Sequence, residues 1–310
     1  SASRSARGQG RRMSSSAPFS ITAQALHDDI RHTRKLSLGC AVLDRVLGGG
    51  IDVQGITEVA GSAGAGKTQL VLRCLLHVQL PPSEGGLSGG AIYIFSEGSS
   101  QPSMRRLHAL ADVYGERYRH LGATSQYLME KIVSVEADEP ELLMRRLETI
   151  ETEVLRARPI RLIVIDSIAA VFRADDTPDD PYGKVDRGAG YAARAKSMLA
   201  LAARLKQLSH RYDLAVIVTN QVTDKPAEAI DEHRLAPWER GASLAEGSLH
   251  DGLRLPALGI SWANCVNTRL LLSRRMATVT ATATAPPQYD DAPPPHAAPP
   301  HAAPPHAAPP

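Results

Sequence analysis

The octapeptide Gly61–Thr68, with the sequence GSAGAGKT, has the residue types and spacing of a phosphate-binding loop. It fits the pattern G-x-x-x-x-G-K-[ST], in which glycines let backbone N–H groups surround phosphate oxygens. Lys67 would place a cation on the terminal phosphates, and the Thr68 hydroxyl would bind Mg²⁺. The pattern therefore predicts a site for a nucleoside triphosphate with Mg²⁺, in preference to a glycine-rich turn with a chance lysine.

Further polar residues follow apolar runs and have the chemistry to complete such a site. Asp166 ends the run RLIVID, where a carboxylate can hold Mg²⁺ directly or through water, or can be the N-cap of a helix. Glu97 follows the run AIYIFS and is either a carboxylate that activates the attacking water or a solvated turn residue. Asn220 and Gln221 end another run, where an amide either contacts the γ-phosphate or simply ends the strand.

Strands and helices must alternate in the middle of the chain to position these residues. Continuous apolar runs are typical of strands in a sheet that is covered on both faces, and the intervening helices require parallel crossovers. The sequence therefore predicts an α/β fold with a mainly parallel, twisted sheet flanked by helices. The predicted strands are 55–60, 91–95, 162–165 and 214–219, and the predicted helices include 67–78, 143–154 and 198–210.

The overall composition excludes several classes of protein. The chain has 310 residues, of which 43% are hydrophobic and 22% charged, so it is neither wholly disordered nor collagen-like. No apolar stretch is long enough to cross a bilayer. The net charge of +2 does not by itself predict nucleic-acid binding. The three cysteines are widely spaced, which argues against a disulfide framework or a zinc site and fits a reducing compartment.

Both ends of the chain differ in composition from its middle. Residues 1–18 are rich in Ser, Arg, Gly and Ala and contain no acid, as in a disordered arm or a transit peptide. Residues 286–310 are dominated by Pro, Ala and His, which predicts an extended low-complexity tail. We therefore expect a flexible basic arm with a linker over 1–34, a nucleotide-binding core over 35–285 and a disordered tail over 286–310.

The motifs and their order resemble the RecA-type recombinase family in its eukaryotic branch. The resemblance covers residues 35–275 and includes the blocks LSLGC, GGGI, GITE, YIFSEG, LIVIDS and TNQV, with the phosphate loop among them. Three blocks, LSLGC, GGL and PALGISWAN, are more similar to the X-ray repair cross-complementing paralogues than to the recombinase itself. The resemblance implies a P-loop NTPase with a RecA-like ATPase core over 35–285.

The resemblance also implies a role for each matching position. Glu97 would be the water-activating carboxylate, Thr68 and Asp166 would hold Mg²⁺, and Gln221 would be the sensor amide that joins the nucleotide to the second DNA-facing loop. Arg106 would lie against the adenine. The residues implied to act in hydrolysis are Lys67, Glu97 and Gln221. Those implied to bind ATP are Gly61, Ser62, Ala63, Gly64, Ala65, Gly66, Lys67, Thr68, Gln69 and Arg106.

The sequence departs from the family pattern where the family contacts DNA and neighbouring subunits. The two implied DNA-facing loops, 173–190 and 222–256, carry more acids than Lys and Arg, so independent DNA binding should be weak. Residues 22–23 fall at the family's protomer-docking segment, but Phe19 is one place too early for its aromatic residue. Low-complexity sequence replaces the closing strands after Arg275, which predicts a sheet edge that is incomplete or covered by a partner. Trp262 is expected on or beside a strand.

These features favour a DNA-repair ATPase module of homologous recombination. It would bind Mg–ATP at an interface with a related paralogue subunit of the C type and assist recombinase assembly on single-stranded or branched DNA. Hydrolysis should be slow and DNA-dependent, with ATP acting mainly as a switch. The alternative is a nucleotide-binding scaffold that hardly hydrolyses ATP and acts through protein contacts. No membrane partner is expected, and the expected location is the nucleus, with organellar targeting by the arm left open.

Overall fold

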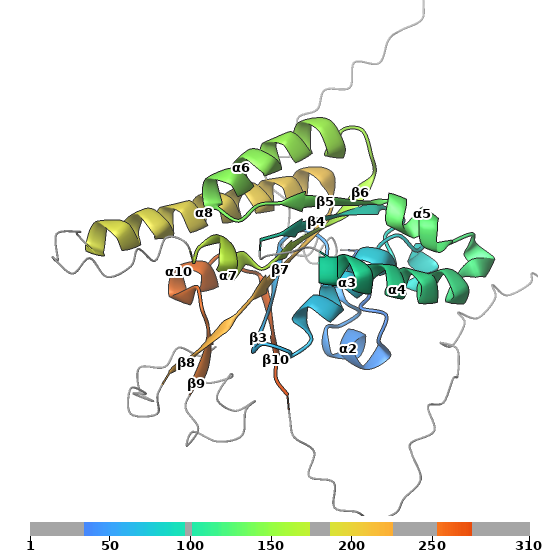
Figure 1. Cartoon of the computed structure of the whole chain (residues 1–310), viewed down its shortest axis with the longest axis horizontal. Coiled ribbons are helices and arrows are strands. Elements are labelled where there is room, and N and C mark those ends of the chain that lie inside the picture. Colours follow the sequence, from blue (N-terminus) through green and yellow to red (C-terminus); the bar gives the residue numbers. More distant parts are fainter. Residues whose placement is uncertain (1–33, 97–100, 174–186, 226–252, 275–310) are drawn as a thin grey trace, which may run out of the picture. The chain divides into compact units, whose positions relative to one another are not determined.

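The computed structural model describes residues 34–96, 101–173, 187–225 and 253–274, which lie within the unit Ser1–Arg274. It confirms the predicted α/β class, because six parallel strands form one sheet in the order β10-β3-β7-β6-β4-β5 (Figure 1). The strands are β3 (Ile56–Gly61), β4 (Gly90–Phe95), β5 (Ile132–Glu136), β6 (Ile160–Asp166), β7 (Ala215–Asn220) and β10 (Thr268–Leu272). Every residue of β3 and β7 is buried, as continuous apolar strands in the middle of a covered sheet require.

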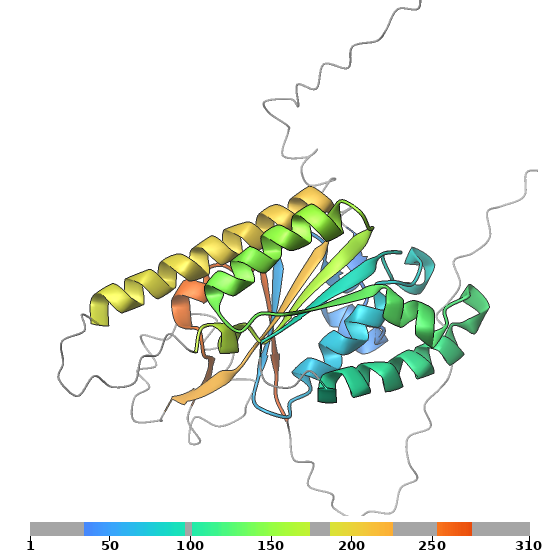
Figure 2. The same cartoon turned by 45° about the horizontal axis from the view of Figure 1, so that its top comes forward.

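Helices cover both faces of this sheet, with a separate hydrophobic cluster under each layer (Figure 2). The cluster around Val59 and Leu75 lies on one face, and the cluster around Ile163 and Leu205 lies on the other. The first face carries α3 (Lys67–His77), α4 (Gln101–Arg117) and α5 (Ser125–Glu130). The second carries α6 (Pro140–Thr149), α7 (Ile168–Val171), α8 (Arg187–Tyr212) and α10 (Gly259–Ala263).

Smaller elements flank the main sheet. One antiparallel pair joins β1 to β2 around a short helix, and another joins β8 to β9 beyond the end of β7. The elements are β1 (Lys35–Leu36), α2 (Ala41–Val46), β2 (Ile51–Asp52), β8 (Val222–Lys225) and β9 (Leu253–Pro256), with 3₁₀ turns at η1 (Pro82–Glu84) and η2 (Arg119–Leu121). Within the described ranges no helix is long and apolar enough to span a membrane.

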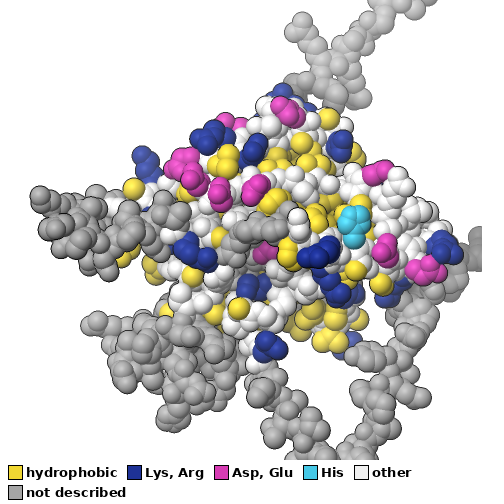
Figure 3. Space-filling model, viewed as in Figure 1, with side chains coloured by type: hydrophobic (Ala, Val, Ile, Leu, Met, Phe, Trp, Pro, Cys, Tyr) yellow, Lys and Arg dark blue, Asp and Glu magenta, His cyan; other side chains and the backbone are white. Residues whose placement is uncertain are grey.

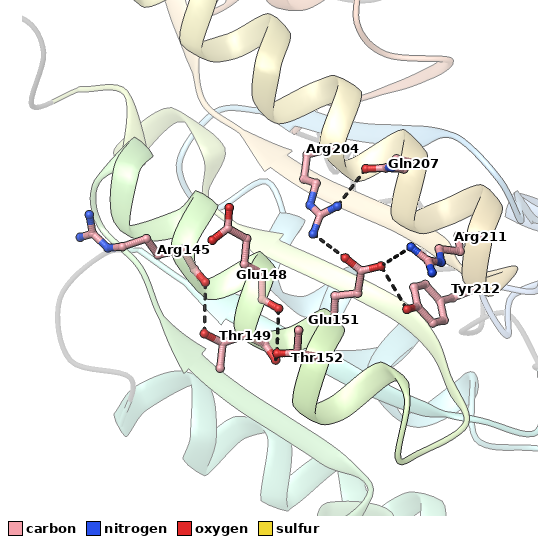
Figure 4. Close-up of polar contacts among 9 residues, drawn as sticks. All are labelled: Arg145, Glu148, Thr149, Glu151, Thr152, Arg204, Gln207, Arg211 and Tyr212. Atoms are coloured by element: carbon pink, nitrogen blue, oxygen red, sulfur yellow. Dashed lines mark hydrogen bonds and ion pairs between the residues drawn. The ribbon is translucent and has the colours of Figure 1, made fainter.

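The second face is tied together by a buried carboxylate (Figure 4). The helical pattern predicted over 143–154 begins as α6 but continues from Thr149 as a π-helical turn, η3 (Ile150–Leu155). This turn presents Glu151 to α8, where it accepts hydrogen bonds from Arg204 (2.5 Å), Arg211 (3.0 Å) and the Tyr212 hydroxyl (3.1 Å). Burial opposes the charged form, but the Arg204 contact and the other partners hold the pKa of Glu151 below its usual value.

Some predicted elements differ from the observed ones. Trp262 was expected on or beside a strand, which is wrong: it lies on α10 and is fully buried against the second-face cluster. The strands β5 and β10 were not predicted, because β5 is half-exposed at a sheet edge and β10 follows a polar turn. The predicted first DNA-facing loop, 173–190, overlaps the start of α8, and the predicted second loop, 222–256, begins and ends in β8 and β9. The arm, the tail and the docking segment 22–23 lie outside the described residues, so the predicted domain boundaries stay predictions.

Candidate nucleotide-binding site

The predicted phosphate loop lies between the end of β3 and the start of α3, as its chemistry requires. Gly66 precedes the helix with φ of +97°, a conformation that L side chains rarely adopt, and a Cβ added there would meet nothing within 4 Å. At the other end, a Cβ on Gly61 would come within 2.5 Å of the Leu272 carbonyl oxygen of β10. The loop is thus open in front of Gly66 and closely packed behind Gly61, which fits a backbone cradle for an anion.

Two side chains of the loop are placed for phosphate and metal chemistry. The Lys67 ammonium donates hydrogen bonds to the carbonyl oxygens of Gly61 (2.8 Å) and Ser62 (3.0 Å), which hold its charge across the loop. Thr68 lies half-buried in the first turn of α3, an 11-residue helix whose N-terminus carries the positive end of its dipole. Both groups therefore lie where a polyphosphate with Mg²⁺ would meet favourable charge.

Asp166 lies at the carboxyl end of β6 and is held by two hydroxyl groups. The Tyr93 hydroxyl donates to one carboxylate oxygen at 3.2 Å, and the Thr219 hydroxyl donates to the other. Tyr93 comes from β4 and Thr219 from β7, the two neighbours of β6, so all three side chains lie on the α3 face of the sheet. Burial, and next the Asp166 charge, raise the pKa of Tyr93, so this hydroxyl stays protonated and remains a donor.

Glu97 lies outside the described residues, and the last described residue before it is Ser96. The Ser96 backbone N–H donates to the Asp166 carbonyl oxygen at 3.1 Å. The Ser96 hydroxyl donates to the Ser167 carbonyl oxygen at 2.6 Å and accepts from the Ser167 N–H at 2.9 Å. These bonds fix the end of β4 beside the end of β6, and the role predicted for Glu97 stays a prediction.

The two amides at the end of β7 occupy different environments. Asn220 is fully buried, and its amide donates to Glu58 at 2.7 Å on the sheet face away from α3. Gln221 is only half-buried, and its side-chain oxygen accepts from Arg173 at 2.9 Å. Arg173 lies where the first predicted DNA-facing loop begins, and Gln221 lies directly before the second. The contact therefore joins the starts of the two loops, while the sensor role of Gln221 stays a prediction.

Two arginines lie beside the loop, one of them unexpected from the sequence. Arg106 on α4 donates to the Gln69 side-chain oxygen at 2.7 Å, which places it near the start of α3, and its contact with adenine stays a prediction. Arg274, which follows β10, lies so close to the loop that a Cβ on Gly64 would be 3.1 Å from its guanidinium. No motif marks Arg274, because only the pairing of β10 with β3 brings it there. Figure 3 shows Lys and Arg side chains at several places on this face of the molecule, with one group over the region of α3 and α4.

A polar cluster at the far end of α3 anchors that helix. The Arg73 guanidinium donates to the Tyr114 hydroxyl of α4 at 3.2 Å and also to the Gly39 carbonyl oxygen. His77 is 2% exposed beside Tyr114. Burial, and next the positive charge of Arg73, lower the pKa of His77 to about 4, so it is neutral near pH 7. This cluster joins α3, α4 and the segment before α2, and so fixes the helix whose first turn completes the phosphate loop.

Comparison with known proteins adds to this geometry. The family model described as Rad51 matches residues 31–235 of the chain. The chain is 36% identical over 255 residues to the DNA repair protein XRCC3 homolog of Arabidopsis thaliana, a match that covers 78% of this chain and 76% of that protein. It is 41% identical over 251 residues to the DNA repair protein XRCC3 of Bos taurus, with 78% of this chain and 64% of that protein covered.

A third relative matches a shorter stretch of the chain. The chain is 33% identical over 205 residues to the DNA repair and recombination protein RadA of Metallosphaera sedula, a match that covers 66% of this chain and 58% of that protein. The chain thus spans less than two thirds of the Bos taurus and Metallosphaera sedula proteins.

Proposed function

Because the chain belongs to the Rad51 family, in the branch of the recombinase paralogues that its motifs predict, we propose that it is a DNA-repair module of homologous recombination that binds Mg–ATP. The observation that carries this proposal is that Lys67, Thr68 and Asp166 lie at the same edge of the sheet. Lys67 and Thr68 follow β3 and Asp166 ends β6, and these two parallel strands are separated by β7 alone. All three residues therefore lie at the carboxyl edge, where open α/β sheets bind their ligands.

Different residues at this edge would bind the phosphates and the Mg²⁺. The loop N–H groups and Lys67 would bind the phosphates, and Thr68 with Asp166 would hold Mg²⁺, which when bound neutralises phosphate charge. Tyr93 and Thr219 keep the Asp166 carboxylate turned toward this face. We place Glu97 as the base that orients water, and Gln221 as the group that reports the nucleotide to the DNA-facing loops.

The partners we propose follow from the relatives and from the charge of the chain. The proteins it resembles are named as DNA repair and recombination proteins, which supports a nuclear role beside a recombinase and a related paralogue subunit. Single-stranded or branched DNA would be the nucleic-acid partner. The excess of acids in the two predicted DNA-facing loops supports weak DNA binding by the chain alone.

The first test measures nucleotide binding and steady-state ATP turnover, with and without single-stranded DNA. Lys67→Ala should weaken Mg–ATP binding by roughly 100-fold, because a charge-assisted contact with phosphate is lost. Lys131→Ala is the matched control, since the Lys131 ammonium lies over the Tyr127 ring, 4.2 Å from its centroid. Unchanged nucleotide binding by Lys67→Ala would contradict the assignment of this loop to the nucleotide site.

The same measurement separates the two functional classes. Turnover that rises with DNA and disappears in Lys67→Ala supports a DNA-dependent ATPase. Nucleotide binding with turnover at the level of Lys67→Ala supports the scaffold, which would act through protein contacts and need another subunit to complete its site.

A further inference from the structure

A charged group lies buried in the sheet, one strand in from its β10 edge, on the face away from α3. Glu58 of β3 is 0% exposed, and its carboxylate accepts hydrogen bonds from Asn220 Nδ2 of β7 at 2.7 Å and from Arg269 Nε of β10. Because β3 lies between β7 and β10, this carboxylate joins three adjacent strands. We call Glu58, Asn220 and Arg269 the buried network.

The packing around the network does not require a charge. Ile56 and Val218 lie on the same face of β3 and β7 and belong to the hydrophobic cluster under α8. Burying an ion pair costs about as much as its attraction returns, and well-packed apolar residues of similar size often serve equally well. Stability alone therefore gives little reason for a carboxylate and a guanidinium at this place.

The position of the network connects it to both halves of the proposed site. Glu58 lies three residues before Gly61, where the phosphate loop begins. Asn220 lies directly before Gln221, which accepts from Arg173 through its side chain and from the Ala257 N–H through its backbone. Gln221 thus lies directly before the β8–β9 pair, and the network holds Asn220, the residue before Gln221.

The Asn220 side chain also has an unused acceptor. Its Oδ1 atom is buried and has no hydrogen-bond partner among the described residues, so Glu58 determines how this amide is oriented. Because Glu58 is the partner of the Asn220 amide, a shift of β3 can move this amide as well. β3 leads directly into the phosphate loop.

We propose that the buried network is a positioning device, which holds the end of β7 in register with the phosphate loop so that Gln221 and β8 respond to bound nucleotide. This proposal rests on the proposed function of the loop. None of the three residues touches the nucleotide or the reacting atoms; they act through Gln221.

The test compares two paired substitutions in the whole 310-residue chain. Glu58→Met with Arg269→Met removes the network without leaving a buried charge. Glu151→Met with Arg204→Met is the matched control, because it removes a buried carboxylate–guanidinium pair on the same sheet face, away from the phosphate loop. Glu58→Gln, which keeps the size of the side chain and an acceptor for Asn220, is a second variant in case the network pair does not fold.

Amide hydrogen exchange over residues 219–225 is the readout, first without nucleotide and then with Mg²⁺ and a non-hydrolysed ATP analogue. The network pair should raise exchange there by about tenfold or more, and the control pair should not. The analogue should slow this exchange in the wild-type and control proteins but not in the network pair. Glu58→Gln, which keeps the acceptor for Asn220 but loses the ion pair with Arg269, should raise the exchange less and should keep part of the response to the analogue.

The outcomes separate the two proposals. If the network pair exchanges and responds like the wild type, the network is only structural and the inference is overturned. If the wild type binds no nucleotide, the proposed function fails, and the nucleotide-free exchange alone decides whether the network fixes the end of β7.

Discussion

At the scale of single residues, the orientation of the Asp166 carboxylate depends on side chains from the two neighbouring strands. Strand position brings Asp166 to the ligand edge, but the hydroxyls of Tyr93 and Thr219 decide which way its oxygens face. The sequence predicted Asp166 from its place after an apolar run, and it could not predict the two hydroxyls, since they come from strands 73 and 53 residues away.

Tyr93→Phe should therefore weaken Mg²⁺ binding in the presence of ATP while lowering stability only modestly. The lost hydrogen bond is worth about 1 kcal/mol of stability. Without it the Asp166 carboxylate can rotate, so half-saturation of the site should need a several-fold higher Mg²⁺ concentration. A Mg²⁺ titration of nucleotide binding, with unfolding in urea, measures both effects. Tyr114→Phe is the control, because it removes a hydroxyl that contacts Arg73 instead. An equal Mg²⁺ effect in the two variants would contradict this role for Tyr93.

At the scale of elements, α3 is a helix with one end at the ligand edge and the other in the Arg73–His77–Tyr114 cluster. The apolar spacing of the sequence predicted this helix over 67–78, close to the observed Lys67–His77. The cluster was not predicted, because it depends on Gly39 and Tyr114, which lie far from α3 in the sequence.

This cluster predicts a loss of stability in mild acid. The pKa of His77 is lowered to about 4 in the fold, against an ordinary value of 6.5, so between these values the unfolded chain binds more protons. The free energy of unfolding should therefore fall as the pH drops from about 6.5 toward 4, by up to roughly 3 kcal/mol.

Urea unfolding at pH 7 and pH 5 measures this effect. His77→Gln should show a smaller difference between the two pH values, because Gln does not titrate. Both pH values lie above the usual pKa range of carboxyl groups. The pKa of Glu151 is lowered in the fold, so protonation of Glu151 reduces the free energy of unfolding only at more acid pH. The same difference in wild type and His77→Gln would assign the acid sensitivity to other groups.

At the scale of the whole molecule, the sequence predicted the class of fold and the core of the site because both depend on local patterns. The parallel sheet follows from continuous apolar runs, and the phosphate loop follows from an octapeptide. The missed features, such as Arg274 beside Gly64 and the Glu58 network, depend on the order of strands in the sheet. That order places β10 beside β3, and no local pattern in the sequence predicts this pairing.

The charge of the chain predicts weak, salt-sensitive binding to single-stranded DNA. With a net charge of +2 and acid-rich predicted loops, the isolated chain can neutralise few phosphates. We expect dissociation constants of about 10⁻⁶ M or weaker at physiological salt, the range of non-specific binding. Fluorescence anisotropy with a labelled oligonucleotide at two salt concentrations tests this. Nanomolar affinity of the chain alone would contradict it.

The strand order also has a consequence for synthesis on the ribosome. Glu58 emerges early, but its partners Asn220 and Arg269 follow it by 162 and 211 residues. Until they are translated, β3 has neither neighbour in the sheet, and its carboxylate has neither partner. The strand that leads into the phosphate loop therefore joins the sheet late, and a nascent chain halted before residue 268 leaves one of its edges open to chaperones or to other chains.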